Sequence, residues 1–376
     1  MAKEPTFIKE MMSNYIKEVF ITEQIMNEAV DLLYEKLVVF GGGAKYGQIV
    51  FMSGGAGSGK GFASKTFMEA EKFKIRDVDE WKKAYLELAK LKGTNPELKT
   101  LDLKNSDDVF KLHMFVKKRG TKDKTLEMLL ADVKADRLPN IIFDITGKEM
   151  SDFDEVIPRL IETGYEAKNI HVAWVLTDFK VAYTANLTRE RVVPAQVFLD
   201  THQGAAKTMQ KLIDAKKMPE GANGRFVVIM NNRENTIFFN TGDVYKGKKV
   251  DLKNQKKVGA QGVSGFYYIT VKEAGQPFKA EETWKEELHK QIVDNVPGGQ
   301  DGIDQLRKNA LEALQKQADD PSAKDKNRAA ARQGIDLVKR DAAKDRILGR
   351  LTNLPSNASQ AQKDARQKTL DRLRNK

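Results

Sequence analysis

One short stretch of the chain has the residue types and spacing to hold a polyphosphate. It consists of Gly54, Gly55, Gly57, Ser58, Gly59, Lys60 and Gly61. Glycines let successive backbone N–H groups turn toward one anion, and the N-terminus of a following helix adds a favourable potential for negative charge. Lys60 supplies a point charge for the β- and γ-phosphate oxygens. The pattern therefore predicts ATP binding; the alternatives are a plain glycine-rich turn or a degenerate, inactive loop.

The position after Lys60 departs from the usual form of this motif. A Ser or Thr normally stands there and its hydroxyl contacts Mg²⁺, whereas this chain has Gly61 followed by Phe62. Because Mg²⁺ keeps several waters when it bridges phosphates, we expect it to arrive with ATP without a dedicated protein metal site. The chain has no cysteine and its four histidines are too scattered for a metal-ligand spacing.

Buried strands and helices must position this loop. Short apolar runs predict strands over 48–53, 140–144, 170–176 and 225–230, with 236–239 pairing with the last of these as a hairpin-like arm. Helical spacing predicts a helix from near Lys60 and another over 153–161. Strands that alternate with helices predict an α/β fold, a P-loop NTPase-type parallel sheet flanked by helices.

Composition and spacing divide the chain into three parts. We predict N-terminal helices over 1–40, a P-loop kinase-like domain over 41–300 with a mainly helical insertion at 80–138, and a basic helical or partly disordered tail over 301–376. The tail has no aromatic residue and carries 18 Lys and Arg against 11 Asp and Glu. We expect solvated or partner-bound helices there, broken near Pro321 and Pro355, with an anionic or protein partner.

The whole-chain composition excludes several classes of protein. The absence of cysteine excludes disulfides and thiol nucleophiles and fits a reducing compartment. No run reaches the roughly 18 apolar residues of a membrane span, and the N-terminus lacks a signal peptide's apolar run. We therefore expect a cytoplasmic protein without membrane contact, and association with a virion stays open. The net charge of +11 favours anionic partners such as nucleotides, nucleic acid or acidic surfaces.

Four further motifs follow the glycine loop in order: Asp77-Val78-Asp79, Asp144-Ile145-Thr146-Gly147-Lys148, Arg189-Glu190-Arg191 and Asn232-Arg233-Glu234. With the loop, they make the chain resemble the zeta-toxin family of P-loop kinases over about residues 20–245. The resemblance implies ATP-dependent phosphoryl transfer, and it extends to proteins encoded by bacterial viruses.

By this resemblance two groups carry the chemistry. Asp79 is the base that accepts the proton of the substrate hydroxyl, with Asp77 as second candidate, and phosphoryl transfer needs such a carboxylate. Arg191, and after it Arg189, would belong to a basic lid that neutralises charge on the transferred group. The alternatives are a solvated acidic turn and a surface basic turn.

Other residues would bind substrates. The resemblance assigns Asp144, Thr146 and Lys148 to the acceptor, and polar residues at the carboxyl end of a parallel strand independently face the crevice where ligands bind. Asp144 could instead lie near the metal, or be an ordinary strand-end acid. Asn232 and Arg233 would lie beside the adenine, where an Arg can stack on a base, or form a polar turn. His202 could face the site or be structural.

The sequence therefore predicts a kinase that moves the γ-phosphoryl group of ATP to a hydroxyl of a small molecule. The resemblance suggests a nucleotide sugar such as UDP-N-acetylglucosamine, and the Gly-Lys-Gly loop leaves a nucleotide or polynucleotide open. The alternative is a non-catalytic nucleotide-binding assembly protein, or a nucleic-acid-associated protein whose basic tail contacts phosphates.

Overall fold

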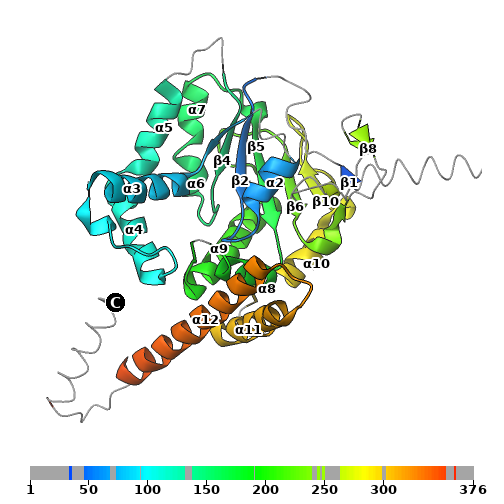
Figure 1. The fold of residues 1–376 in the computed structure, drawn as a ribbon. Helices are drawn as coiled ribbons and strands as arrows, with labels where there is room; N and C mark the ends of the chain where they lie inside the picture. Colours follow the sequence, from blue (N-terminus) through cyan, green and yellow to red (C-terminus); the bar gives the residue numbers. More distant parts are fainter. Residues whose placement is uncertain are drawn as a thin grey trace, which may run out of the picture.

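The structure is a computed structural model, and it describes residues 34–35, 46–67, 73–93, 95–131, 138–189, 191–238, 244–245, 248–249, 263–298, 302–352 and 360. The strands are β1 (Tyr34–Glu35), β2 (Ile49–Ser53), β3 (Lys74–Arg76), β4 (Ile141–Asp144), β5 (Ile170–Leu176), β6 (Phe226–Met230), β7 (Thr236–Phe238), β8 (Val244–Tyr245), β9 (Lys248–Lys249) and β10 (Val263–Lys272). The main sheet runs in the order β1-β10-β6-β5-β2-β4-β3, with β7 paired to β10. Figure 1 labels β4, β2, β5, β6, β10 and β1 of this sheet.

The half of the sheet that carries the glycine loop is parallel. β3, β4, β2, β5 and β6 pair in parallel, whereas β10 pairs antiparallel with β6, β7 and β1. β2, β5 and β6 are buried along their whole length, which explains their continuous apolar sequence. This confirms the predicted α/β fold with a mostly parallel sheet.

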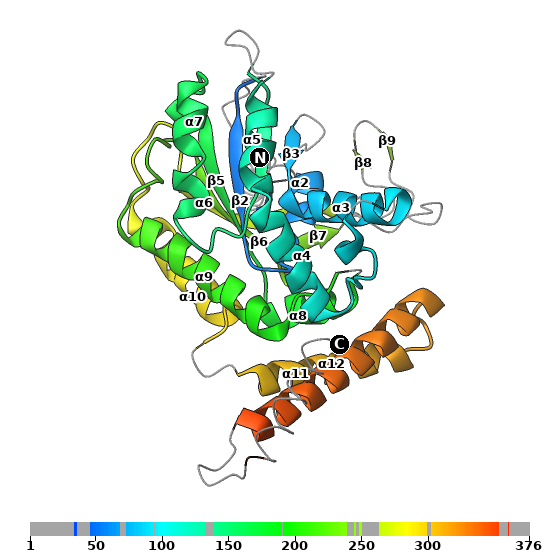
Figure 2. The same ribbon diagram turned by 90° about the vertical axis from the view of Figure 1, so that its left-hand side faces the viewer.

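Helices cover both faces of this sheet (Figure 2). They are α2 (Lys60–Phe67), α3 (Val78–Lys92), α4 (Ser106–Lys118), α5 (Thr121–Ala131), α6 (Ser151–Asp154), α7 (Ile157–Glu162), α8 (Phe179–Leu187), α9 (Ala195–Asp214), α10 (Lys285–Asn295), α11 (Ile303–Asp319) and α12 (Asp325–Thr352). α2 lies on one side of β2, and α6, α7 and α9 lie on the other.

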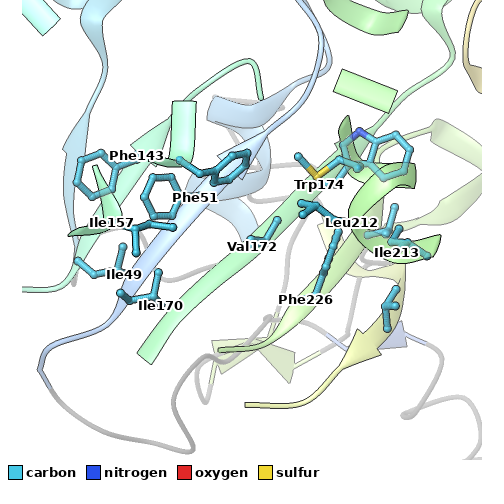
Figure 3. Packing of buried hydrophobic residues seen from close by; sticks show 14 of the residues in the cluster. Ile49, Phe51, Phe143, Ile157, Ile170, Val172, Trp174, Leu212, Ile213 and Phe226 are labelled. Atoms are coloured by element: carbon cyan, nitrogen blue, oxygen red, sulfur yellow. The ribbon is translucent and has the colours of Figure 1, made fainter. Parts of the chain in front are cut away.

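The core forms on both faces because successive strand residues point to opposite sides. Ile49 and Phe51 of β2 belong to the larger cluster, with α6, α7 and α9, and Val50 and Met52 pack with Ala63 of α2 on the other face. In the larger cluster the rings of Phe51 and Phe143 stack with centroids 5.0 Å apart (Figure 3). Burial of each such side chain stabilises the folded state by about 1.5–3 kcal/mol. The strand that leads into the glycine loop is therefore held firmly in the core.

Two predicted elements near this sheet differ from the structure. The predicted pairing of 236–239 with 225–230 is wrong, since β7 pairs with β10 and β6 has β10 and β5 as its neighbours. The strand β10 itself was not predicted. The helix predicted over 153–161 is divided into α6 and α7, and Pro158, in the first turn of α7, lacks the N–H that a continuous helix needs there.

Most of the predicted N-terminal helices lie outside the described residues. The exception is β1, where Tyr34 and Glu35 pair with Tyr267 and Phe266 of β10, so the helix predicted through this point is wrong for these two residues. In the predicted helical insertion, α3, α4 and α5 account for most of the described residues.

The described part of the tail packs on the body of the protein. α11 ends at Asp319 and α12 begins at Asp325, on either side of the break expected near Pro321; the break expected near Pro355 lies outside the described residues. Both helices lie beside α8 (Figures 1 and 2), so the face that packs there is covered by the body of the protein rather than solvated. An anionic or protein partner for the tail stays a prediction.

The structure contains no helix suited to crossing a bilayer within the residues it describes.

Candidate phosphate-binding site

The glycine loop joins the carboxyl end of β2 to the N-terminus of α2, as predicted. Gly57 and Gly59 have φ angles of 75° and 84°, in the left-handed region that glycine adopts without cost. A Cβ atom at Gly59 would overlap the side-chain amide of Asn231. The first N–H groups of α2 have no partners within the helix, so this end of α2 can bind an anion.

Side chains from three other segments form hydrogen bonds with the main chain of this loop. The Ser58 carbonyl accepts hydrogen bonds from Thr177 Oγ1 at 2.7 Å and from Asn231 Nδ2 at 2.8 Å. The Ala56 N–H donates to Thr201 Oγ1 at 3.1 Å. These bonds fix the peptide planes before any ligand binds, which lowers the entropy cost of binding a phosphate chain.

Lys60 lies across the start of the loop. Its Nζ donates to the carbonyls of Gly54 at 2.8 Å and Gly55 at 3.4 Å, and it lies 3.7 Å from Asp144 Oδ1. The Lys60 and Asp144 side chains are 15% and 23% exposed, so a ligand can reach both. Phosphate binding by Lys60 stays a prediction.

The segment after β4 runs alongside the loop. Asp144 is paired with Met52 of β2 in the sheet register, and the Thr146 carbonyl accepts bonds from Ser53 Oγ at 2.9 Å and Gly54 N at 3.1 Å. The Lys148 carbonyl accepts from Thr208 Oγ1 of α9 at 2.7 Å, and its side chain is exposed. The structure thus brings this predicted acceptor segment directly beside the phosphate loop.

The Asp79 segment reaches the same edge of the sheet. β3 pairs in parallel with β4, and Arg76 lies opposite Phe143, so the chain leaves β3 beside Asp144. α3 begins at Val78, which puts Asp79 in its first turn. β3 was not predicted, but it explains how Asp79 comes to this edge.

The segment predicted to be a basic lid, which carries Arg189 and Arg191, lies between α8 and α9. Asn186 of α8 bonds both main-chain groups of Val193, at 2.9 and 3.0 Å, and the Arg189 carbonyl accepts a bond from Lys104. Arg189 is exposed and Arg191 is half-buried. These bonds fix a compact turn between α8 and α9, and about six helical residues of α9, roughly 9 Å, separate it from Thr201 beside the loop.

The predicted adenine-binding residues follow β6. The buried side chain of Asn232 accepts from the Asp178 N–H at 2.8 Å and donates to Asn295 Oδ1 at 2.6 Å, so it links β6 to α8 and α10. Arg233 begins a short 3₁₀ helix, Arg233–Asn235. A role for either residue beside the adenine stays a prediction.

The rings of the two buried histidines, His202 and His171, form hydrogen bonds with neighbouring parts of the chain. Burial lowers the pKa of His202 to about 4, and Nε2 lies 2.8 Å from the Ala56 carbonyl, which can only accept, so a neutral ring donates to the loop. A Cβ atom at Gly55 would overlap this ring. Burial likewise lowers the pKa of His171 to about 3, and its ring bonds Gln48 and the Arg225 N–H.

Sequence reasoning assigned no role to three residues that contact the loop directly, Thr177, Asn231 and Thr201. The first two follow the carboxyl ends of β5 and β6. The rule that pointed to Asp144 at the end of β4 applies equally to these strand ends and could have found them. Thr201 carries no comparable signal, because its contact depends on how α9 packs.

In a comparison with protein families, residues 43–243 match the family described as zeta toxin. No curated protein matches significantly.

Solved structures with similar chains include the PezAT chromosomal toxin–antitoxin system of Streptococcus pneumoniae, with 16% identity, a TM-score of 0.32 and coverage of 61% of this chain and 78% of that one. The complex of AvrRxo1-ORF1 with AvrRxo1-ORF2 also matches. With sulphate ions it gives 14% identity and a TM-score of 0.38, and with ATP 12% and 0.40. Each covers 78% of this chain and 79% of the other.

Proposed function

The chain belongs to the zeta toxin family, and from this membership we propose that it is a kinase that transfers the γ-phosphoryl group of ATP to a hydroxyl of a small molecule. The family consists of P-loop kinases, so nucleotide-binding phosphotransferase chemistry is its general activity. The observation that best supports the proposal is the glycine loop, whose main chain is held by side-chain hydrogen bonds and which has Lys60 and Asp144 beside it.

Phosphate binding would use the loop and its lysine. The N–H groups at the start of α2 attract the phosphate chain. Lys60 turns from the Gly54 carbonyl to the β- and γ-phosphate oxygens. Its new bonds are charge-assisted on both sides, and such bonds are roughly twice as strong as neutral ones.

The transfer step needs one base and a means of balancing charge. The acceptor oxygen forms a bond to the γ-phosphorus while the bond from that phosphorus to the β–γ bridging oxygen breaks, and ADP leaves. The hydroxyl proton passes to the Asp79 carboxylate. Lys60 stabilises the charge that builds on the transferring group, and Arg191 and Arg189 would add to this stabilisation.

The residues fit a Mg²⁺ ion that is held mainly by ATP. Within the described ranges there is no group of three or more acidic or histidine side chains arranged for a metal. Asp144 offers one carboxylate beside Lys60, and Mg²⁺ in phosphoryl-transfer sites is commonly held by one or two carboxylates together with phosphates and water. When bound, the ion would neutralise charge on the phosphate oxygens. Gly61 offers no hydroxyl to it.

The acceptor would lie along the segment after β4. Thr146 and the exposed Lys148 offer a hydroxyl and a cation to an acceptor that carries an anionic group. A nucleotide sugar or a nucleotide has both the hydroxyl and the phosphate that this chemistry requires.

The test is ATP consumption by the full-length chain across a panel of nucleotide sugars, nucleotides and oligonucleotides. We expect consumption that depends on one acceptor class and is lost in Asp79→Asn with nucleotide binding retained. Glu87→Gln, an exposed acid on the same helix, is the matched control and should act like the parent. Full turnover in Asp79→Asn would refute the assignment of the base. If no acceptor in the panel stimulates ATP consumption by the parent, the proposed acceptor class is refuted.

A further inference from the structure

The tail helices lie outside the segment that matches the family, yet they pack into the same cluster as the glycine loop. Leu306, Ala310 and Leu314 of α11 and Ala331, Ile335 and Val338 of α12 are buried in it. α8 contributes Tyr183 and Leu187 to this cluster, and Ala56 of the glycine loop packs against it. The apolar face of the tail is therefore covered by the kinase body itself.

Gly334 of α12 lies close to both α11 and α8. A Cβ atom there would lie 3.0 Å from Leu314 Cδ1 of α11 and 3.5 Å from Leu187 Cβ of α8. A side chain as large as leucine exceeds the space that these neighbours leave, so we expect it to push α12 away from one of them.

A buried cation joins the tail to α8. The Arg307 side chain of α11 is only 9% exposed and pairs with Asp345 of α12 at 2.7 Å. The Arg307 guanidinium also lies close enough to the Tyr183 hydroxyl to act on it electrostatically. Tyr183 thus lies in the cluster with the tail helices, and its hydroxyl lies near their buried cation.

An unbroken series of contacts leads from Tyr183 to the loop. Its ring meets Phe198 of α9 edge to face, with centroids 5.1 Å apart, and Phe198 lies 4.5 Å from the His202 ring. His202 Nε2 then bonds the Ala56 carbonyl at 2.8 Å. Three aromatic side chains therefore fill the space between the tail and the peptide of Ala56.

We propose that the α11–α12 hairpin positions the phosphate loop, acting through Tyr183, Phe198 and His202 on the Ala56 peptide. The inference rests on the proposed function, since it assumes that the loop binds ATP. With the hairpin docked, Tyr183 and Phe198 hold the His202 ring against the Ala56 carbonyl, and the loop is ordered in advance. With it displaced, ATP must order the loop as it binds, and the affinity falls accordingly.

The first experiment measures MgATP affinity by calorimetry in the full-length chain. Gly334→Leu displaces α12, and Gln333→Leu places the same side chain at an exposed neighbouring position as the control. We expect Gly334→Leu to weaken binding about fivefold or more, within the usual range of coupling between separate sites, and Gln333→Leu to match the parent. Equal affinity in all three proteins would overturn the inference while leaving ATP binding itself intact. A parent that binds no MgATP would instead refute the proposed function.

A double-mutant cycle separates positioning from general loss of stability. If the hairpin acts through the histidine, His202→Ala weakens MgATP binding in the parent but adds little in Gly334→Leu. Additive losses would mean that the two sites act independently and would overturn the proposal. Should Gly334→Leu not fold, Tyr183→Phe takes its place in the cycle, because it removes the hydroxyl that lies near Arg307 and keeps the ring.

Discussion

Replacing Gly59 by alanine should destabilise the chain in a way that the structure allows us to estimate. The residue has a φ of 84°, and its Cβ would overlap the Asn231 amide, which donates to the Ser58 carbonyl. A left-handed conformation costs an L-residue about 1–2 kcal/mol, and loss of the hydrogen bond costs about 1 kcal/mol. We therefore expect Gly59→Ala to lower the free energy of unfolding by about 2–3 kcal/mol.

Gly61 provides the matched control, because it is part of the same motif but has different surroundings. Nothing lies within 4 Å of a Cβ atom built there, and its φ is not in the left-handed region. It also lies in the first turn of α2, and alanine is favoured over glycine within helices by roughly 0.5–1 kcal/mol. Gly61→Ala should therefore be as stable as the parent or slightly more stable.

Urea denaturation followed by far-ultraviolet circular dichroism measures both effects on one scale. The midpoint of Gly59→Ala should fall while that of Gly61→Ala stays or rises, with unchanged slopes. Equal stability of Gly59→Ala and the parent, or equal destabilisation by both substitutions, would refute the loop geometry described above.

Three further outcomes follow from the structure. Burial lowers the pKa values of His171 and His202 to about 3 and about 4. The unfolded chain therefore binds protons first as the pH falls below about 6.5, and denaturation at about pH 5 should show a loss of about 1–2 kcal/mol per histidine relative to about pH 7. Gly61→Ser adds a hydroxyl in open space, so calorimetry should show about a fewfold tighter ATP binding with Mg²⁺ and no change with a chelator. Asn186→Ala leaves both buried main-chain groups of Val193 unpaired and should cost about 2–3 kcal/mol in urea denaturation.

The glycine loop and its flanking elements could be predicted because the signals are local. The strand that ends at Ser53 and the helix that begins at Lys60 are each encoded by a few consecutive residues, and the structure confirms both. The neighbouring strands β4, β5 and β6 were predicted for the same reason, as short continuous apolar runs.

The elements that were missed depend on pairing between distant segments. β10 inserts beside β6 and takes β7 as its partner, which no local pattern indicates. The tail looked polar because its apolar residues are sparse, mostly small, and spaced for one helix face. Only the position of α8 shows what that face covers.

In the candidate site, too, some contacts follow from local sequence signals and others depend on packing between distant segments. Asp144 and Lys60 follow from strand-end and loop rules, and they lie 3.7 Å apart. The contacts of Thr201 and His202 with Ala56 join residues about 145 positions apart, and only the packing of α9 against the loop creates them.

The central claim is that the loop and Lys60 hold the phosphate chain of ATP. Calorimetric titration of the full-length chain with ATP and Mg²⁺ tests it most directly. We predict saturable binding to the parent and an affinity lower by about tenfold or more in Lys60→Ala, as expected for the loss of charge-assisted bonds. A parent that releases no heat of binding, or a Lys60→Ala variant that binds as tightly as the parent, would contradict the account.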